Sequence, residues 1–128
     1  MHKAQAQVRD FMRAIGQPSP NDLQVNLPPE RLALRRRLIA EEAKEFEEAA
    51  TVPDQIDALC DLLYVTYGAA VEMGIDLESF FELVHEANLR KVPGPVREDG
   101  KKLKPEGWKP PDIEGELHRL LDREERLL

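Results

Sequence analysis

The chain contains little cysteine and few aromatic residues. Among its 128 residues there is one cysteine, Cys60, and one tryptophan, and aromatic residues make up 5%. A single cysteine excludes a disulfide framework within one chain, and its position in an apolar segment favours a small core side chain. We therefore expect a protein of a reducing compartment, the cytoplasm.

Long hydrophobic runs and an excess of positive charge are also missing. No apolar stretch reaches the roughly 18 residues of a membrane-spanning helix, and the opening MHKAQAQVRD contains no apolar signal region. Basic residues number 18 against 25 acidic ones, which gives a formal net charge of −7. This balance disfavours nucleic-acid polymers as partners, because phosphate neutralisation requires clustered Lys and Arg. The composition predicts a soluble protein that binds neither a membrane nor a nucleic acid.

Strand patterns are absent, whereas helical periodicity and helix-ending residues are frequent. We expect helices over residues 3–15, 29–50, 53–73, 76–92 and 112–128. Between them lie a loop at 16–28 and a basic loop rich in Pro and Gly at 93–111, with a short turn at Asp99-Gly100. The sequence predicts a single all-α domain over residues 1–128.

The second and third helices are predicted to form the centre of this helical bundle. They are separated only by the short connection Thr51–Pro53, which favours an antiparallel hairpin. The third helix is apolar on nearly every side from Ile56 to Val71, more than one chain of this size is expected to cover. We therefore expect a second copy to complete the bundle, giving a homodimer or a larger homo-oligomer.

Carboxylates interrupt the apolar pattern of this hairpin. Glu42 and Glu45 fall on the same helix stripe as Leu38, where the periodicity requires core residues. Asp57 and Asp61 lie four residues apart in the apolar third helix. A buried carboxylate is costly unless a cation or a strong donor meets it. The pattern therefore predicts a bound cation between the two helices.

The residue types indicate which cation. Carboxylate oxygens are the ligands of hard cations, and the scarcity of Cys and His nearby disfavours zinc and copper. We expect Mg²⁺, with Mn²⁺ as the alternative. The candidate ligands are Glu41, Glu42, Glu45, Asp57 and Asp61. The alternative interpretation of EEAKEFEE alone is a solvated charge run, and the acidic pair in the apolar helix favours the metal site over it.

The ordered motifs resemble a known superfamily. EE-x-x-E in EEAKE, followed by D-x-x-x-D-L-L-Y in DALCDLLY, is similar to the all-α nucleoside triphosphate pyrophosphohydrolases. These include MazG-like proteins, dimeric dUTPases and phosphoribosyl-ATP pyrophosphohydrolases. HEANLRKV and EDGKKLKPEGWKPPDI extend the similarity to roughly residues 30–113. The second motif of the superfamily is commonly E-x-x-D, whereas here Ala58 stands three residues before Asp61 and Asp57 one place earlier.

The resemblance implies a Mg²⁺-dependent enzyme that cleaves a nucleoside triphosphate between the α and β phosphates, giving a monophosphate and pyrophosphate. Of the adjacent Glu41 and Glu42, one would orient or deprotonate the attacking water, and the core-facing stripe favours Glu42. A house-cleaning activity such as dUTP hydrolysis is expected, with phosphoribosyl-ATP as the alternative substrate. An alternative of another class is a non-catalytic, metal-binding helical interaction protein.

A local excess of basic residues follows the acidic hairpin. The segment from Arg90 to Lys109 contains seven basic residues and three acidic ones, a positive balance that suits binding of a phosphorylated small molecule. The candidate substrate-binding residues are His85, Asn88, Lys91, Lys104, Trp108 and Lys109, with Arg97, Lys101 and Lys102 as further cations. The alternatives are solvated lysines, an ordinary imidazole, an amide that caps the helix and a tryptophan that attaches the loop to the bundle.

Overall fold

The computed structural model describes residues 1–127, which form five α-helices and no regular strand. The helices are α1 (Lys3–Ala14), α2 (Pro29–Glu48), α3 (Val52–Glu72), α4 (Leu77–Leu89) and α5 (Ile113–Leu127). The all-α prediction is confirmed, and each expected helix is present with its ends shifted by a few residues. The last helix was expected to include Leu128, which lies outside the described residues.

The described chain divides into two compact units, Met1–Leu77 and Glu78–Leu128. The first contains α1, α2 and α3, and the second contains most of α4, the basic loop and α5. Each unit is described here by itself. The single domain expected from the sequence stays a prediction.

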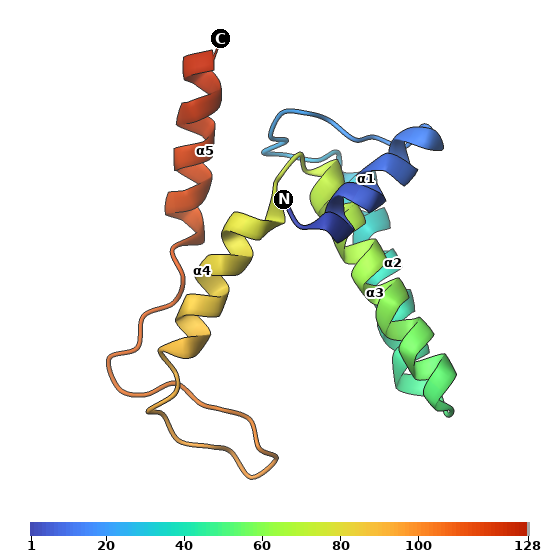
Figure 1. Ribbon diagram of the computed structural model, residues 1–128. Coiled ribbons are helices and arrows are strands. Elements are labelled where there is room, and N and C mark those ends of the chain that lie inside the picture. Colours follow the sequence, from blue (N-terminus) through green and yellow to red (C-terminus); the bar gives the residue numbers. More distant parts are fainter. Residues whose placement is uncertain (128) are drawn as a thin grey trace. The chain divides into compact units, whose positions relative to one another are not determined.

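The hairpin of α2 and α3 is the frame of the first unit (Figure 1). Thr51 ends the connection as the N-cap of α3, and its hydroxyl accepts a hydrogen bond from the amide of Asp54 at 3.3 Å. Pro53 then occupies the first turn, where its missing N–H costs nothing. These two signals make the chain reverse within a few residues, so the hairpin prediction is confirmed.

α1 packs against α3 and closes one end of this hairpin. The contact buries Val8 and Met12 of α1 against Val71, with Tyr67 alongside. Gln5 is buried as well, and both ends of its amide are bonded: Nε2 donates to the carbonyl of Ile75, and Oε1 accepts from the amide of Leu77. A satisfied amide thus attaches α1 to the connection that follows α3.

A face of α3 remains exposed in the single chain. Ile56, Leu59, Leu63 and Tyr64 are exposed by 58%, 46%, 59% and 41%. The expectation that one chain leaves this helix uncovered agrees with these values, and the partner copy stays a prediction. No single helix among residues 1–127 is long and apolar enough to cross a membrane; only α3 and α4, taken together as a bent pair, meet that test by length and composition.

The basic loop of the second unit is folded on itself. Val96 and Lys102 form an isolated antiparallel bridge, and the amide of Arg97 donates to the carbonyl of Lys101. The intervening turn passes through Gly100 at φ +92°, a conformation that favours glycine, so the predicted turn at Asp99-Gly100 is confirmed. Asp112 directly precedes α5, and its carboxylate accepts a hydrogen bond from the amide of Gly115 in the first turn.

Candidate functional site: an acidic cluster in the helix hairpin

Three carboxylates converge between α2 and α3. Glu42 and Glu45 come from α2, and Asp61 comes from α3. Each offers an oxygen, and these atoms all lie within 4.8 Å of one another. The geometry follows from the hairpin, because residues three apart lie on one face of a helix and the antiparallel partner presents Asp61 to that face. The first unit alone therefore assembles an all-oxygen cluster.

Glu42 carries the strongest electrostatic anomaly of this cluster. Its Oε2 atom is buried and has no hydrogen-bond partner among the described residues. Partial burial raises the pKa of its carboxyl, and the hydrogen bond with Glu45 raises the pKa further. The negative charges of the neighbouring carboxylates act in the same direction. The three carboxylates therefore repel one another, and a bound cation would reduce this repulsion.

This donor set fits a hard divalent cation. Carboxylate oxygens are what Mg²⁺ prefers, and Mg²⁺ sites in proteins usually use few carboxylates and leave other positions to water or substrate phosphates. The orphaned oxygen of Glu42 has no protein donor to compensate its burial. Glu42, Glu45 and Asp61 are therefore the residues that could hold such an ion.

The two other predicted ligands lie outside this group. Glu41 is exposed and acts on Glu42 through its charge. Asp57 is also exposed, one turn nearer the tip of the hairpin, where it lines a shallow cavity of about 280 Å³ with Glu45 and Asp54. The structure thus brings together three of the five predicted carboxylates.

In the second unit, two of the predicted cations gather on the tryptophan. The Nζ atoms of Lys91 and Lys104 lie 5.1 and 5.0 Å from the centre of the Trp108 ring. The indole donates from Nε1 to the carbonyl of Ala87 at 2.8 Å. Trp108 therefore attaches the basic loop to α4, which was the alternative interpretation of this residue, and its ring contacts two ammonium groups.

The remaining candidates of this unit do not join that group. His85 and Asn88 are exposed on α4, and the backbone carbonyl of Asn88 accepts from the amide of Lys91. Lys109 is exposed, and its carbonyl accepts from the guanidinium of Arg90 at 3.4 Å. Their side chains stay candidates on the basis of residue type.

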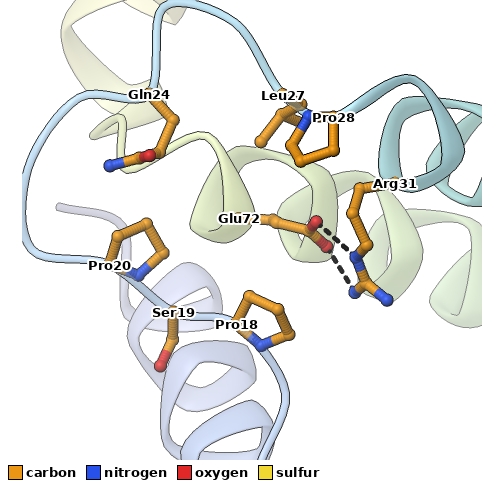
Figure 2. A pocket seen from close by; sticks show the side chains of 8 residues that line it. All are labelled: Pro18, Ser19, Pro20, Gln24, Leu27, Pro28, Arg31 and Glu72. Carbon is orange, nitrogen blue, oxygen red and sulfur yellow. Dashed lines mark hydrogen bonds and ion pairs between the residues drawn. The ribbon is translucent and has the colours of Figure 1, made fainter.

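The sequence analysis missed a buried ion-pair cluster at the other end of the hairpin. Arg31 donates to both oxygens of Glu72 at 2.7 and 2.8 Å, and Arg35 donates from Nε to the same carboxylate at 2.7 Å. Figure 2 shows Arg31 and Glu72 in the wall of a cavity of about 420 Å³, beside the prolines of the 16–28 loop. The sequence signal that could have revealed this cluster is the spacing of Arg31 and Arg35, four residues apart on one helix face, together with Glu72, the single acid at the end of the apolar helix.

A comparison with models of protein families covers the segment that contains the acidic cluster. The family model described as phosphoribosyl-ATP pyrophosphohydrolase matches residues 8–88, more than half of the chain and all three carboxylates of the acidic cluster. A search of curated proteins found no match. The protein therefore belongs to the phosphoribosyl-ATP pyrophosphohydrolase family, hydrolases of phosphoric anhydride bonds within the all-α nucleoside triphosphate pyrophosphohydrolase superfamily.

Proposed function

We propose that the protein is a metal-dependent nucleotide pyrophosphohydrolase that cleaves the bond between the α and β phosphates and releases a monophosphate and pyrophosphate. One observation carries this proposal: the oxygens of Glu42, Glu45 and Asp61 converge to within 4.8 Å inside the segment that the family model matches. A hard cation at this point neutralises phosphate charge and makes the phosphorus a better electrophile.

The residues of the cluster take separate roles in this proposal. Glu45 and Asp61 hold Mg²⁺ or Mn²⁺ together with Glu42. Glu42 is also the group that orients the attacking water and accepts its proton, because it lies on the core-facing stripe of α2 together with Leu38 and Glu45. Glu41 and Asp57 flank the cluster, where they bind a further ion or share these roles.

The phosphates require cations as well, because the acidic cluster by itself would repel a triphosphate. We assign this role to Lys91, Lys104 and Lys109 on the basis of their charge. The two ammonium groups beside Trp108 support the assignment, since both Lys91 and Lys104 place positive charge against the same ring. His85, Asn88 and Trp108 are proposed to contact the substrate by residue type: an imidazole, an amide that donates and accepts, and an indole that stacks.

Two substrate classes follow from this site. Ordinary nucleoside triphosphates, with dUTP as the house-cleaning example, are supported by the resemblance of EEAKE and DALCDLLY to the wider superfamily. Phosphoribosyl-ATP is supported by the family description itself. Both share the triphosphate that the acidic cluster suits, and they differ in the nucleoside that carries it. We place the protein in the cytoplasm as a homodimer, on the evidence of its lone cysteine and the exposed apolar face of α3.

A substrate screen tests the proposal directly. The purified protein would be incubated with each common NTP and dNTP, with dUTP and with phosphoribosyl-ATP, in the presence of Mg²⁺, Mn²⁺ or a chelator. Separation of the products distinguishes α–β cleavage, which releases pyrophosphate, from β–γ cleavage, which releases phosphate. Metal-dependent pyrophosphate release from at least one compound is expected. If no compound releases pyrophosphate, the non-catalytic, metal-binding interaction protein becomes the better description.

A further inference from the structure

Another cavity of the first unit lies one helical turn from the acidic cluster. It has a volume of about 340 Å³ and is formed by α1, α2 and α3. Its walls are mostly apolar, and its lining includes Val8, Met12, Leu34, Leu38 and Val65. A volume above about 300 Å³ and a mostly apolar wall with few polar groups are typical of small-molecule sites.

One polar group in this cavity lacks a partner. Arg35 lines the cavity, its side chain is only 8% exposed, and its Nε is engaged by Glu72. Its Nη2 is buried and has no hydrogen-bond partner among the described residues. A guanidinium can only donate hydrogen bonds, so an occupant of the cavity would meet Arg35 with an acceptor atom.

The local charge also favours an acceptor. Arg31 and Arg35 share the single carboxylate of Glu72, which leaves one positive charge in excess at this point. A group that presents an N–H to Arg35 would leave two donors facing each other, and unpaired buried donors are costly. The cavity thus discriminates between acceptor and donor edges of otherwise similar molecules.

The cavity wall also offers a flat ligand an aromatic surface. The rings of Phe11 and Tyr64, both in the wall, form an edge-to-face pair with centres 5.7 Å apart. Gly68 faces the guanidinium, and a Cβ at this position would lie 3.1 Å from Nη1 of Arg35. The absence of a side chain at residue 68 therefore leaves Arg35 the space it occupies.

The cavity lies close to the acidic cluster along both helices of the hairpin. On α2, Leu38 lies four residues before Glu42, about 6 Å along the helix axis. On α3, Tyr64 and Val65 follow Asp61 by three and four residues. The cavity is therefore within reach of the sugar and base of a nucleotide whose phosphates lie at the acidic cluster.

We propose that this cavity holds the nucleobase of the substrate and that Arg35 selects bases which present a hydrogen-bond acceptor to its guanidinium. The inference rests on the proposed function and adds the source of its base selectivity. Glu72 acts behind Arg35 as a positioning residue, because its carboxylate fixes the guanidinium through Nε and leaves Nη2 without a partner among the described residues.

Binding of nucleosides tests the cavity without metal or turnover. Nucleosides lack phosphates, so their contacts are independent of the acidic cluster. With isotope-labelled protein and millimolar nucleoside, NMR shifts are expected at the methyl groups of Val8, Leu34 and Val65. Val65→Phe fills the cavity and should remove these shifts. Ala33→Phe, an exposed position of α2 outside the cavity, is the matched control and should keep them.

Selectivity tests Arg35 itself. Arg35→Met leaves Glu72 paired with Arg31, and Gly68→Ala keeps the ion pairs while crowding the guanidinium. For the preferred nucleotide, Arg35→Met should raise KM about 10- to 100-fold, the effect of losing one hydrogen bond to a charged group. The KM of poorly used nucleotides should change little, so that discrimination between bases shrinks. Gly68→Ala should change the base preference in the same direction with a smaller effect.

The outcomes separate the two proposals. Turnover without nucleoside shifts at the cavity, or equal KM changes for all nucleotides, overturns the base site and leaves the hydrolase intact. Nucleoside shifts that vanish in Val65→Phe, in a protein that hydrolyses no nucleotide, support the base site and overturn the hydrolase. A change of oligomeric state in Val65→Phe with no nucleoside effect in the wild type would show that a second copy fills the cavity and overturns the base site.

Discussion

Arg35 on α2 donates from Nε to Oε1 of Glu72 on α3 at 2.7 Å. Both side chains are almost fully buried, with exposures of 8% and 2%. Arg31 completes the cluster with two hydrogen bonds to the same carboxylate. Glu72 thus fastens α2 to the last turn of α3, at the opposite end of the hairpin from the acidic cluster.

Glu72→Gln should destabilise the protein strongly, because it leaves two partly buried guanidinium groups without their counter-charge. Loss of one partner of a buried ion pair typically costs about 3–5 kcal/mol. Urea denaturation followed by circular dichroism measures this difference. Glu48→Gln is the matched control: its exposed pair with Lys44, at 3.9 Å, should change stability by less than about 0.5 kcal/mol. Equal effects in the two variants would contradict a structural role of Glu72.

The same carboxylate predicts a pH dependence. Burial works to raise the pKa of Glu72, but the hydrogen bonds from Arg31 and Arg35 and their charges outweigh it and hold the pKa below its usual range. The folded pKa therefore lies below the unfolded one. Its contribution to stability is complete above the unfolded value and is lost as the pH falls through the folded value. Denaturation midpoints should fall more steeply below about pH 5 in the wild type than in Glu72→Gln. Parallel pH profiles would argue against this sign.

Much of the fold follows from local signals in the sequence. The periodicity of Val8 and Met12 places α1, and Thr51 with Pro53 fixes the start of α3, so helices and hairpin were predictable. The exposed face of α3 also follows from composition, because Leu59 and Leu63 lie in a helix that is apolar on every side. Such signals act within one turn of helix or one connection.

Local sequence signals do not determine which of the candidate carboxylates come together in the site. Glu42 was recognised because it interrupts an apolar stripe, but Asp57 does so too and lies outside the cluster. The difference depends on the rotation and register of α3 against α2, which the sequence does not specify. The partnership of Arg35 with Glu72 was missed for the same reason, since it joins residues 37 positions apart.

Removal of one carboxylate from the acidic cluster should abolish turnover and leave the fold intact. Glu45→Gln and Asp61→Asn each keep the side-chain shape and remove one charge, and even outer partners of a metal site typically cost about 10- to 100-fold when removed. We expect losses of at least this size in kcat/KM. Without metal, both variants should melt higher than the wild type, because a source of repulsion is gone. Glu47→Gln, an exposed glutamate of the same helix, is the control. Wild-type rates in either cluster variant would refute the assignment.

The exposed face of α3 should be covered by a second copy in solution. Burial of a Leu-sized side chain is worth about 1.5–3 kcal/mol, which makes an exposed row of such residues costly. Light scattering should therefore give at least twice the 14.6 kDa mass of the chain. Leu63→Glu should dissociate the assembly, whereas Val25→Glu, at an equally exposed apolar position in the 16–28 loop, should not. A wild-type monomer at micromolar concentration would exclude the dimer.

The basic loop should bind the phosphates and close when nucleotide and metal are present. Its turn at Gly100 and its glycines at 94 and 107 permit movement, whereas the Trp108 hydrogen bond to Ala87 anchors one end. Replacement of Lys104 and Lys109 together by Ala should raise the KM for nucleotide about 10-fold or more, since charged hydrogen bonds are worth about 1.5–3 kcal/mol each. The double replacement should change the affinity for the metal less than it changes the KM for nucleotide.

A second double variant separates local contacts from net charge. The variant Lys3→Ala with Lys44→Ala also removes two positive charges, but from exposed positions of the first unit. Its KM should stay close to that of the wild type. Trypsin reports on the loop itself, because Arg97, Lys101 and Lys102 are cleavable, whereas Lys104 and Lys109 each precede a proline. A non-hydrolysable triphosphate with Mg²⁺ should slow cleavage at these three sites in the wild type but not in the Lys104 and Lys109 double variant. Unchanged cleavage in the wild type would show that the loop does not close on the nucleotide. The rise of KM in the double variant would then be the remaining evidence that the lysines of the loop bind the phosphates.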